Sequence, residues 1–324
     1  MKSLKKGLSA LLIIGVLGVC FVSGGLFYWL HHPQPNKETV VFIAKKTSLA
    51  RIGRLLHHQG VIDHPFLYQL VLYCTGKWRA LKAGEYLIPA GITPLHLLAI
   101  LEAGKVIPHP LTIVEGETSA HVIQKLLADP RFQGSCALPP EGTLLPETYA
   151  FPRGTDRHKI IVRAQREMDR VIQSLWDQRS PGYPLKSWEE MVVLASIIEK
   201  ETALEKEKPL IAAVFLNRLA QGIPLQADPT VVYALTQGVR PLGRSLTRED
   251  LKVESPYNTY RNLGLPPTPI TNPSVSSMKA ALHPTPTSCL YFVADGSGGH
   301  VFCSDLQEHQ KNHATWRGVR KKRK

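Results

Sequence analysis

Apolar residues recur along this chain at both helical and strand spacing, which predicts a mixed α+β fold. Strands are expected at 39–44, 83–88 and 111–114, with a hairpin at 290–302. Helices are expected at 48–59, from 65 onward, at 93–102, around 122–127, at 157–177, from 187 onward, at 208–221, from 228 onward and at 278–283. This order of segments places a small strand–helix–helix–strand unit at 37–105 ahead of a larger mixed unit at 106–324.

The first thirty residues predict a membrane anchor. Residues 7–30 carry no charge, and about 20 apolar residues cross a bilayer core. A cleaved signal peptide has a shorter apolar centre of about 7–15 residues, whereas this run continues through Tyr28 and Trp29, which suit a membrane interface. Lysines precede the span, so the positive-inside rule keeps the N-terminus in the cytoplasm. We therefore expect 1–36 to comprise a cytoplasmic tip, a retained anchor and a short polar linker at 31–36.

The unit at 37–105 has the order and size of a small α/β module. Its second helix begins at Pro65, and the pattern predicts that Phe66, Leu67, Leu70 and Val71 face the core. In topology and size the unit resembles the LysM type of glycan-binding module. That resemblance alone does not show that it binds glycan.

The most informative stretch runs from Ser187 to Gln226. Ser187 precedes Glu190 by three residues, just ahead of an apolar run. Each of the two side chains is therefore expected to accept a hydrogen bond from a free N–H group at a helix start. A helix beginning at Ser187 follows.

Glu201 departs from the apolar pattern of this helix. Leu194, Ile197 and Ile198 share one helix face, and the next position on that face is Glu201. Burial disfavours the charged form of a carboxyl group and raises its pKa. A carboxyl of this kind can donate a proton near neutral pH, as cleavage of a glycosidic bond requires. Glu199 extends the apolar stripe less directly. The alternative is a Glu201 that is solvated or paired with a nearby lysine.

Downstream, Asp228 followed by Pro229 is typical of a helix start with Asp228 as N-cap. Capping explains Asp228 fully, and a role as catalytic base is the minority interpretation. The loops at 257–260 and 264–270 are rich in tyrosine, asparagine and proline. Such loops suit carbohydrate, whose hydroxyls need amide partners and whose ring faces need aromatic side chains.

Charge and cysteine content narrow the function classes. The formal net charge is +13, which favours an anionic partner such as lipid, an acidic polymer or nucleic acid. No zinc-finger spacing or basic heptad region supports nucleic acid, and no C-x-x-C or H-E-x-x-H motif supports a metal site. Cys289 and Cys303 flank the predicted hairpin and could pair if the compartment is oxidising. Buried free thiols are the default for these two and for Cys74 and Cys136. The basic end, 317–324, is expected to be a solvated tail attracted to lipid headgroups.

A series of motifs then identifies a family. They are ASIIEKET at 195–202, FLNRL at 215–219, LQADPTVVY at 225–233, YNTY at 257–260, GLPPTPI at 264–270 and YFVADGSGGHVF at 291–302. Together they resemble the endolytic murein transglycosylases, the YceG-like proteins, over essentially the whole chain.

The resemblance implies a single-pass inner-membrane enzyme with its catalytic domain in the periplasm. Such an enzyme cuts nascent peptidoglycan strands between N-acetylmuramic acid and N-acetylglucosamine and leaves a 1,6-anhydro end. Glycan strands are the implied partner, with peptidoglycan synthases and membrane lipid as further candidates. No nucleic acid, metal or organic cofactor is expected.

The family's essential glutamate is the second Glu of its E-K-E motif, which here is Glu201. Further candidate cleft residues follow from positions in or beside the shared motifs: Glu147, Asn217, Gln226, Asp228, Tyr257, Asn258, Tyr260 and His300. The family usually has Pro-Asp-Thr where this chain has Pro146-Glu147-Thr148, so the role of Glu147 is not carried over directly.

The implied chemistry needs a single carboxyl group. An ordinary glycosidase uses two carboxyl groups about 5–10 Å apart. Here Glu201 protonates the leaving oxygen and then takes a proton from the 6-hydroxyl of the muramyl sugar, which attacks its own anomeric carbon. The alternatives are a muramidase-type hydrolase with Asp228 as base, a membrane-anchored glycan-binding scaffold without catalysis, and a lipid- or nucleic-acid-binding protein acting through its basic tail.

Overall fold

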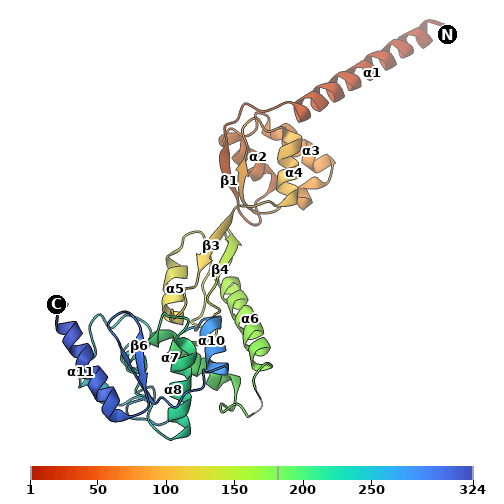
Figure 1. The fold of residues 1–324 in the computed structure, drawn as a ribbon. Helices are drawn as coiled ribbons and strands as arrows, with labels where there is room; N and C mark the ends of the chain where they lie inside the picture. The colour runs from red at the N-terminus through yellow and green to blue at the C-terminus, as the bar shows by residue number, and fades with distance from the viewer. Residues whose placement is uncertain (1, 181, 323–324) are drawn as a thin grey trace. The chain divides into compact units, whose positions relative to one another are not determined.

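The computed structural model describes residues 2–180 and 182–322, with side chains from 13 to 315 apart from residue 181. It confirms the mixed α+β class (Figure 1). The chain divides into two compact units, Met1–His109 with Ala150–Gly154, and Pro110–Tyr149 with Thr155–Lys324. The chain passes between them in two paired strands, β3 (Pro108–Thr112) and β4 (Thr148–Pro152).

The first unit has the predicted strand–helix–helix–strand order. Its two strands pair antiparallel, with Val41 opposite Tyr86, and both side chains are fully buried in the core of the unit. Its elements are α1 (Lys2–His31), β1 (Thr39–Ile43), α2 (Leu49–His58), α3 (Pro65–Cys74), the 3-10 turn η1 (Lys77–Ala80), β2 (Gly84–Ile88) and α4 (Pro94–Ala103).

The predicted inward face of α3 is wrong. Tyr68 and Leu72 are its buried side chains, whereas Phe66 and Leu70 are 76% and 46% exposed. The other two predicted core residues are only half-buried. Because α3 reads PFLYQLVLYC, with apolar residues at nearly every position, a helical period can be drawn through more than one face. Packing against α2 selects the face that is buried.

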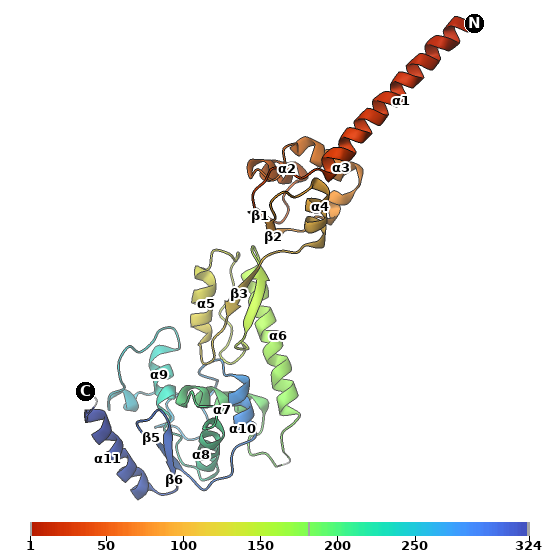
Figure 2. The same ribbon diagram turned by 45° about the horizontal axis from the view of Figure 1, so that its top comes forward.

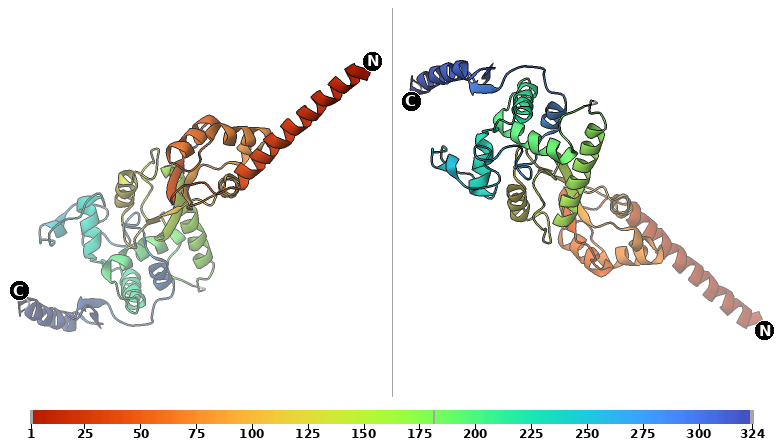
Figure 3. Two further views of the ribbon diagram at one scale, coloured as in Figure 1. Left: turned by 90° about the horizontal axis from the view of Figure 1, so that it is seen from above. Right: turned by 90° about the horizontal axis from the view of Figure 1, so that it is seen from below.

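Helix α1 contains one segment, Ile13–His31, that is long and apolar enough to span a membrane. Most of its length stands clear of the other elements of the unit (Figure 3). Its final turn does not, because Trp29 packs against the apolar core of the unit and its ring centroid lies 6.3 Å from that of His64. The apolar helix is therefore joined to the unit by packing as well as by the chain.

The segment 31–36, predicted as a polar linker, is partly built into the unit. Gln34 and Asn36 are buried. The N–H of Gln34 donates to the carbonyl of Ile92 at 2.9 Å, and Nδ2 of Asn36 donates to the carbonyl of Pro89 at 2.8 Å. These bonds hold the first unit within a few residues of the end of the apolar helix.

The second unit is mainly helical. Helices α7, α8 and α10 pack against one another at its centre (Figure 2). Its elements are α5 (Ser119–Ala128), α6 (Arg157–Trp176), α7 (Trp188–Glu201), α8 (Lys208–Ala220), α9 (Asp228–Thr236), the 3-10 turn η2 (Asp250–Lys252), α10 (Val275–Leu282), β5 (Tyr291–Ala294), β6 (His300–Cys303) and α11 (Leu306–Lys322).

The predicted hairpin is confirmed, with β5 and β6 antiparallel and Tyr291 opposite Cys303. The five cysteines are unpaired, so Cys289 and Cys303 form no disulfide, and Cys74 is exposed rather than buried. Helix α11 packs on β5 and β6, and its backbone remains helical through Lys322, which includes most of the predicted basic tail; residues 323–324 lie outside the described residues.

Helix α7 is buried all round rather than on one face, since every residue from Met191 to Ile198 is buried. Ser187 is its N-cap, as predicted, and accepts from the N–H of Glu190 at 3.4 Å. The carboxylate of Glu190 accepts instead from the N–H of Lys186, at 2.7 Å. At the other end of α7, Glu199 and Glu201 are partly buried while Lys200 is exposed, so the neighbours of the two carboxyl groups decide their chemistry.

Candidate active site

Glu201 is the last residue of α7 and is half-buried. Its carboxyl group has no hydrogen-bond or ion-pair partner among the described residues. Burial, and secondly the negative charge of Asp228, raise the pKa of Glu201 to about 8. Desolvation penalises the charged form and a nearby anion penalises it further, so this carboxyl holds a proton at neutral pH.

Asp228 does not cap α9, which corrects the sequence interpretation. The N-cap is Ala227, no side chain makes a capping bond there, and Asp228 is the first helical residue. Its Oδ1 instead accepts a hydrogen bond of 2.6 Å from the hydroxyl of Tyr260. Burial, followed by this bond to an anion, raises the pKa of the Tyr260 hydroxyl above its usual range. Tyr260 thus donates to the carboxylate that acts on Glu201.

The turn before α9 is held in an uncommon backbone conformation. Gln226 has φ of +53°, a left-handed value that residues other than glycine rarely adopt. Its N–H donates to the carbonyl of Thr259 at 3.1 Å, and its Oε1 accepts from the buried guanidinium of Arg218 at 3.3 Å. Arg218 also donates to the carbonyl of Leu225 at 3.0 Å. These bonds fix the chain that leads into Asp228.

Asn258 lies inside the 257–260 loop. It is fully buried, and its amide donates to the carbonyls of Leu251 at 3.0 Å and Val253 at 2.8 Å. Its Oδ1 accepts from the N–H of Tyr260 at 3.0 Å. The side chain holds the loop that presents Tyr260.

Tyr257 lies on the accessible side of the same loop. Its hydroxyl shares a hydrogen bond of 2.7 Å with Thr268, and its ring centroid lies 4.8 Å from that of Tyr233 on α9. Burial raises the pKa of Tyr233 to about 12. The two rings form an aromatic pair between α9 and the 257–260 loop.

His300, at the start of β6, is joined to the end of α7 through Glu207. Its Nδ1 lies 2.8 Å from Glu207 Oε2, and its N–H donates to Oε1 at 2.9 Å. Glu207 also accepts from the hydroxyl of Thr202 at 3.1 Å, and Thr202 directly follows Glu201. Burial would raise the pKa of Glu207, but the hydrogen bonds from His300 outweigh it and lower that pKa. Glu207 gave no sequence signal, because it lies in a run of charged residues.

Two other predicted cleft residues, Asn217 and Glu147, form hydrogen bonds with backbone groups of other segments. Nδ2 of Asn217 donates to the carbonyls of Thr287 at 2.8 Å and Cys289 at 3.0 Å. Glu147 is exposed just before β4, and its backbone carbonyl accepts from the N–H of Ile113 at 3.0 Å. Asn217 therefore secures the segment before β5, and Glu147 does not line the cavity described below.

Glu199 forms a second carboxylate cluster that the sequence did not reveal. It accepts hydrogen bonds from the N–H of Ser274 at 2.8 Å, from the hydroxyl of Ser277 at 2.7 Å and from the hydroxyl of Ser274. Lys208 is 2% exposed, and its Nζ lies 3.6 Å from Glu199 and 2.7 Å from Glu205. This cluster ties α7, α8 and α10 together.

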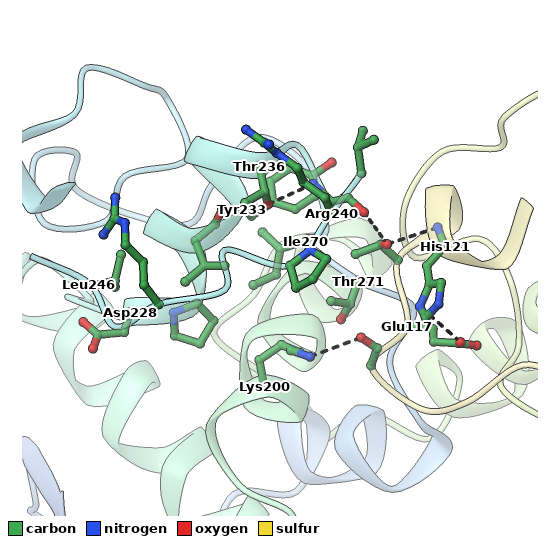
Figure 4. Close-up of a pocket in the computed structure, with 18 of the residues that line it drawn as sticks. Glu117, His121, Lys200, Asp228, Tyr233, Thr236, Arg240, Leu246, Ile270 and Thr271 are labelled. Atoms are coloured by element: carbon green, nitrogen blue, oxygen red, sulfur yellow. Dashed lines mark hydrogen bonds and ion pairs between the residues drawn. The ribbon is translucent and has the colours of Figure 1, made fainter. Parts of the chain in front are cut away.

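A cavity of about 930 Å³ lies beside Asp228 (Figure 4). It is bounded by α5, α9, the 238–246 loop and residues 270–271. Lys200 borders it and donates to the carbonyl of Gly116 at 3.4 Å, while Arg240 is exposed on the opposite wall. Glu201 is not a lining residue, whereas Asp228, the anion that raises the pKa of Glu201, is one. The share of α5 in this wall had no sequence signal, because it depends on a contact across the fold.

Two segments distant in sequence close one end of the cavity. The hydroxyl of Thr118, at the start of α5, donates to the carbonyl of Gly238 at 2.6 Å. The N–H of Ser119 donates to Glu141 at 2.8 Å. Burial outweighs that bond and raises the pKa of Glu141 to about 7. The wall therefore rests on a hydrogen bond from the side chain of Thr118, the N-cap of α5, to the backbone of the turn after α9.

Sequence comparisons with known proteins identify a family and several relatives. The sequence model of the YceG-like family matches residues 41–315. A protein of Bacillus subtilis strain 168 named endolytic murein transglycosylase is 38% identical over 177 residues, which are 53% of this chain and 47% of that protein. One from Streptococcus pneumoniae serotype 2 with the same name is 28% identical over 326 residues, 86% of this chain and 58% of that protein. The chain thus spans about half the length of the curated relatives it matches.

A solved structure supports the fold. The crystal structure of a YceG-like protein from Listeria monocytogenes is 32% identical, with a TM-score of 0.55, and covers 85% of this chain and 98% of that one.

Proposed function

The chain belongs to the YceG-like family, and from this premise we propose that it is an endolytic lytic transglycosylase of peptidoglycan. The observation that carries the proposal is Glu201, a carboxyl without a partner among the described residues whose pKa is raised to about 8. Its anionic neighbour Asp228 borders a cavity of about 930 Å³. The names of the relatives, endolytic murein transglycosylase, support the same activity.

The reaction uses one carboxyl twice. With a pKa near 8, Glu201 is protonated in roughly nine of ten molecules at pH 7. It gives this proton to the bridging oxygen as the bond from C1 of the muramyl sugar breaks. O6 of the same sugar then bonds to C1 while its proton passes to Glu201, which restores the acid. No water is consumed, and the tethered O6 has a high effective molarity.

Asp228 has two proposed parts in this cycle. Its charge keeps the proton on Glu201 before cleavage, and it stabilises the positive charge that develops at C1. Tyr260 orients it through the 2.6 Å hydrogen bond. A hydrolase would need a carboxylate free to activate water, whereas Oδ1 of Asp228 is already bonded to Tyr260.

We assign the remaining candidate cleft residues their roles from the partners that their polar side-chain atoms already have. Gln226 and Tyr257 are proposed to contact the glycan, because Gln226 is exposed beside Asp228 and Tyr257 offers part of an aromatic pair. His300 is proposed as a further contact through Nε2, since Nδ1 is occupied by Glu207. Asn217 and Asn258 are proposed to position loops, because their amides are bonded to backbone carbonyls. For Glu147 we propose no contact.

The cellular setting is also proposed. Helix α1 is compatible with a single membrane span, and we place it in the inner membrane with the N-terminus in the cytoplasm and the second unit in the periplasm. Nascent glycan strands would be met there, beside the synthases that make them. A glycan-binding role for the LysM-like first unit is part of the same proposal.

The test is mass spectrometry of the products made from uncrosslinked glycan strands by the full chain in nanodiscs. Wild type should yield 1,6-anhydro ends, and Glu201→Gln should lose about 10³-fold or more in rate. The matched control is Glu189→Gln, an exposed carboxylate in the first turn of the same helix, which should act like wild type. Reducing ends would indicate the hydrolase instead, and strand binding without cleavage by wild type would indicate the scaffold.

A further inference from the structure

One face of α3 exposes large apolar side chains. Phe66, Leu70 and Tyr73 are 76%, 46% and 70% exposed, and their spacing of four and three residues places them in one row. Trp78, in the following turn η1, is 40% exposed. Helix α3 contains no charged residue. Single exposed apolar residues are ordinary, but a contiguous group of this kind marks an interaction surface.

The row begins beside the end of the apolar helix. The ring of His64, which precedes α3, lies 6.3 Å from the ring of Trp29 in the last turn of α1, and Phe66 follows two residues later. The N–H of Asp63 donates to the side chain of Gln34 at 3.2 Å. Figures 1 and 2 both show α3 at the end of the unit from which α1 leaves. Because tryptophan near the end of a span sits at headgroup level, α3 starts at about that depth.

The residues after α3 suit the same environment. Lys77 and Arg79 flank Trp78, and the guanidinium of Arg79 lies 5.1 Å from the centre of the Trp78 ring. Aromatic and aliphatic side chains next to basic ones are the composition of segments that lie in the membrane interface. Arg79 adds attraction to anionic headgroups, whereas the ammonium of Lys77 lies 3.5 Å from the carboxylate of Glu102.

We propose that the exposed face of α3, with Trp78, lies in the interfacial layer of the membrane that α1 crosses. This rests on the proposed anchoring by α1 and is independent of the catalytic proposal. A lipid surface fits better than a protein partner, because the face adjoins the anchor and carries no acidic residue. The first unit then touches the membrane at α1 and at α3, which fixes its orientation on the bilayer.

The chain supplies its own reporters for a test. Cys20 lies in the apolar helix, and Cys74 lies four residues after Leu70 on the same face of α3; both are exposed in the structure. A matched control is Leu87→Cys, because Leu87 on β2 is 49% exposed, close to the 46% of Leu70. The sheet containing β2 lies on the side of the unit away from α1 (Figures 1 and 2).

The experiment measures the rate at which a water-soluble, membrane-impermeant maleimide modifies each thiol. The full chain is placed at one copy per nanodisc of mixed neutral and anionic phospholipid, and sites are mapped by mass spectrometry. Rates are normalised to the denatured chain. We expect Cys74 to react at least about 10-fold more slowly than Leu87→Cys, which the bilayer does not cover. The triple variant Phe66→Asp, Leu70→Asp, Tyr73→Asp should raise the Cys74 rate to that of the control.

Each other outcome has a distinct meaning. A reactive Cys20 would overturn the anchor, and the α3 proposal with it. A protected Cys20 with a Cys74 as reactive as the control would overturn the α3 proposal alone. Protection of Cys74 that survives the triple variant would also overturn it, since a contact other than lipid insertion would then cover the thiol.

Discussion

Glu199 and Glu201 lie two residues apart at the end of α7, yet their surroundings are opposite. Glu199 accepts hydrogen bonds from Ser274 and Ser277 and lies 3.6 Å from the ammonium of Lys208. Glu201 has no such donor among the described residues and is influenced by an anion, Asp228. Burial alone therefore does not make a carboxyl group reactive. The supply of donors and cations decides whether a buried carboxyl serves the fold or holds a transferable proton.

The largest stability effect should come from the structural partner of this pair. Glu199→Ala removes the buried carboxylate beside the buried Lys208 and leaves its ion pair with the exposed Glu205, and we expect a loss of about 3 kcal/mol in the free energy of unfolding. Urea unfolding at pH 7 measures it. Glu189→Ala, on the exposed first turn of α7, is the control and should stay within about 0.5 kcal/mol of wild type. A loss as small as the control's would show that the cluster does not stabilise the fold.

Glu201, the other carboxyl group of the pair, should make the folded state less stable as the pH rises. The pKa of Glu201 is about 8 in the folded chain against an ordinary value of 4.5, so unfolding releases a proton between these pH values. Stability due to this group is therefore full below about pH 4.5 and is lost as the pH rises to 8. Glu201→Gln lacks that loss and should be more stable than wild type at pH 9 by about 1 kcal/mol or more, allowing for solvent screening. Unfolding curves at pH 4 and pH 9 test this, and a gap that does not change with pH would contradict it.

Removing the anion beside Glu201 should change the pH dependence of activity. Asp228→Asn lowers the pKa of Glu201, because the charge that opposes its ionisation is gone. The alkaline limb of kcat, which requires protonated Glu201, should therefore move to lower pH than in wild type. Initial rates between pH 5 and pH 10 measure the limb. An unmoved limb with a lower rate would mean that Asp228 acts without influencing the proton of Glu201.

The smallest expected effect is at Tyr260. Tyr260→Phe removes one hydrogen bond to Asp228 but keeps the charge, so kcat/KM should fall about 10-fold, equivalent to roughly 1.4 kcal/mol. The alkaline limb should move less than in Asp228→Asn. A fall as large as that of Glu201→Gln would assign Tyr260 a direct part in the chemistry.

The sequence was most informative where local pattern and chemistry coincide. The N-cap at Ser187, the hairpin of β5 and β6, and the position of Glu201 on a buried helix were all predicted because each depends on residues close in the chain. The pattern was wrong for α3, where apolar residues occur on every side and packing alone selects the buried face. In the first unit, the spacing of apolar residues correctly predicted the order of strands and helices, but it did not predict which side chains of α3 are exposed.

The candidate cleft residues were named from motifs, but the contacts between them escaped prediction because the partners are distant in sequence. Asp228 looked like a cap since the Asp-Pro pair is a local signal, but its partner Tyr260 is 32 positions away. Glu199 looked ordinary because its serine donors are 75 and 78 positions away. Asn258 was predicted to be a cleft residue, but its amide donates hydrogen bonds to the backbone carbonyls of Leu251 and Val253. Sequence motifs mark which residues matter and leave open whether a residue touches substrate or holds one that does.

The hydrogen bonds from α8 to the segment before β5 bear on the order in which parts of the candidate site form during synthesis. Asn217 and Arg218 reach carbonyls 70 and 72 positions later in the chain, and Arg218 also sets the turn at Gln226. A nascent chain that has not yet emerged through residue 290 lacks the Leu290 carbonyl to which Nε of Arg218 donates at 2.6 Å. The turn before α9 is therefore linked, through Arg218, to a segment that is made late in synthesis.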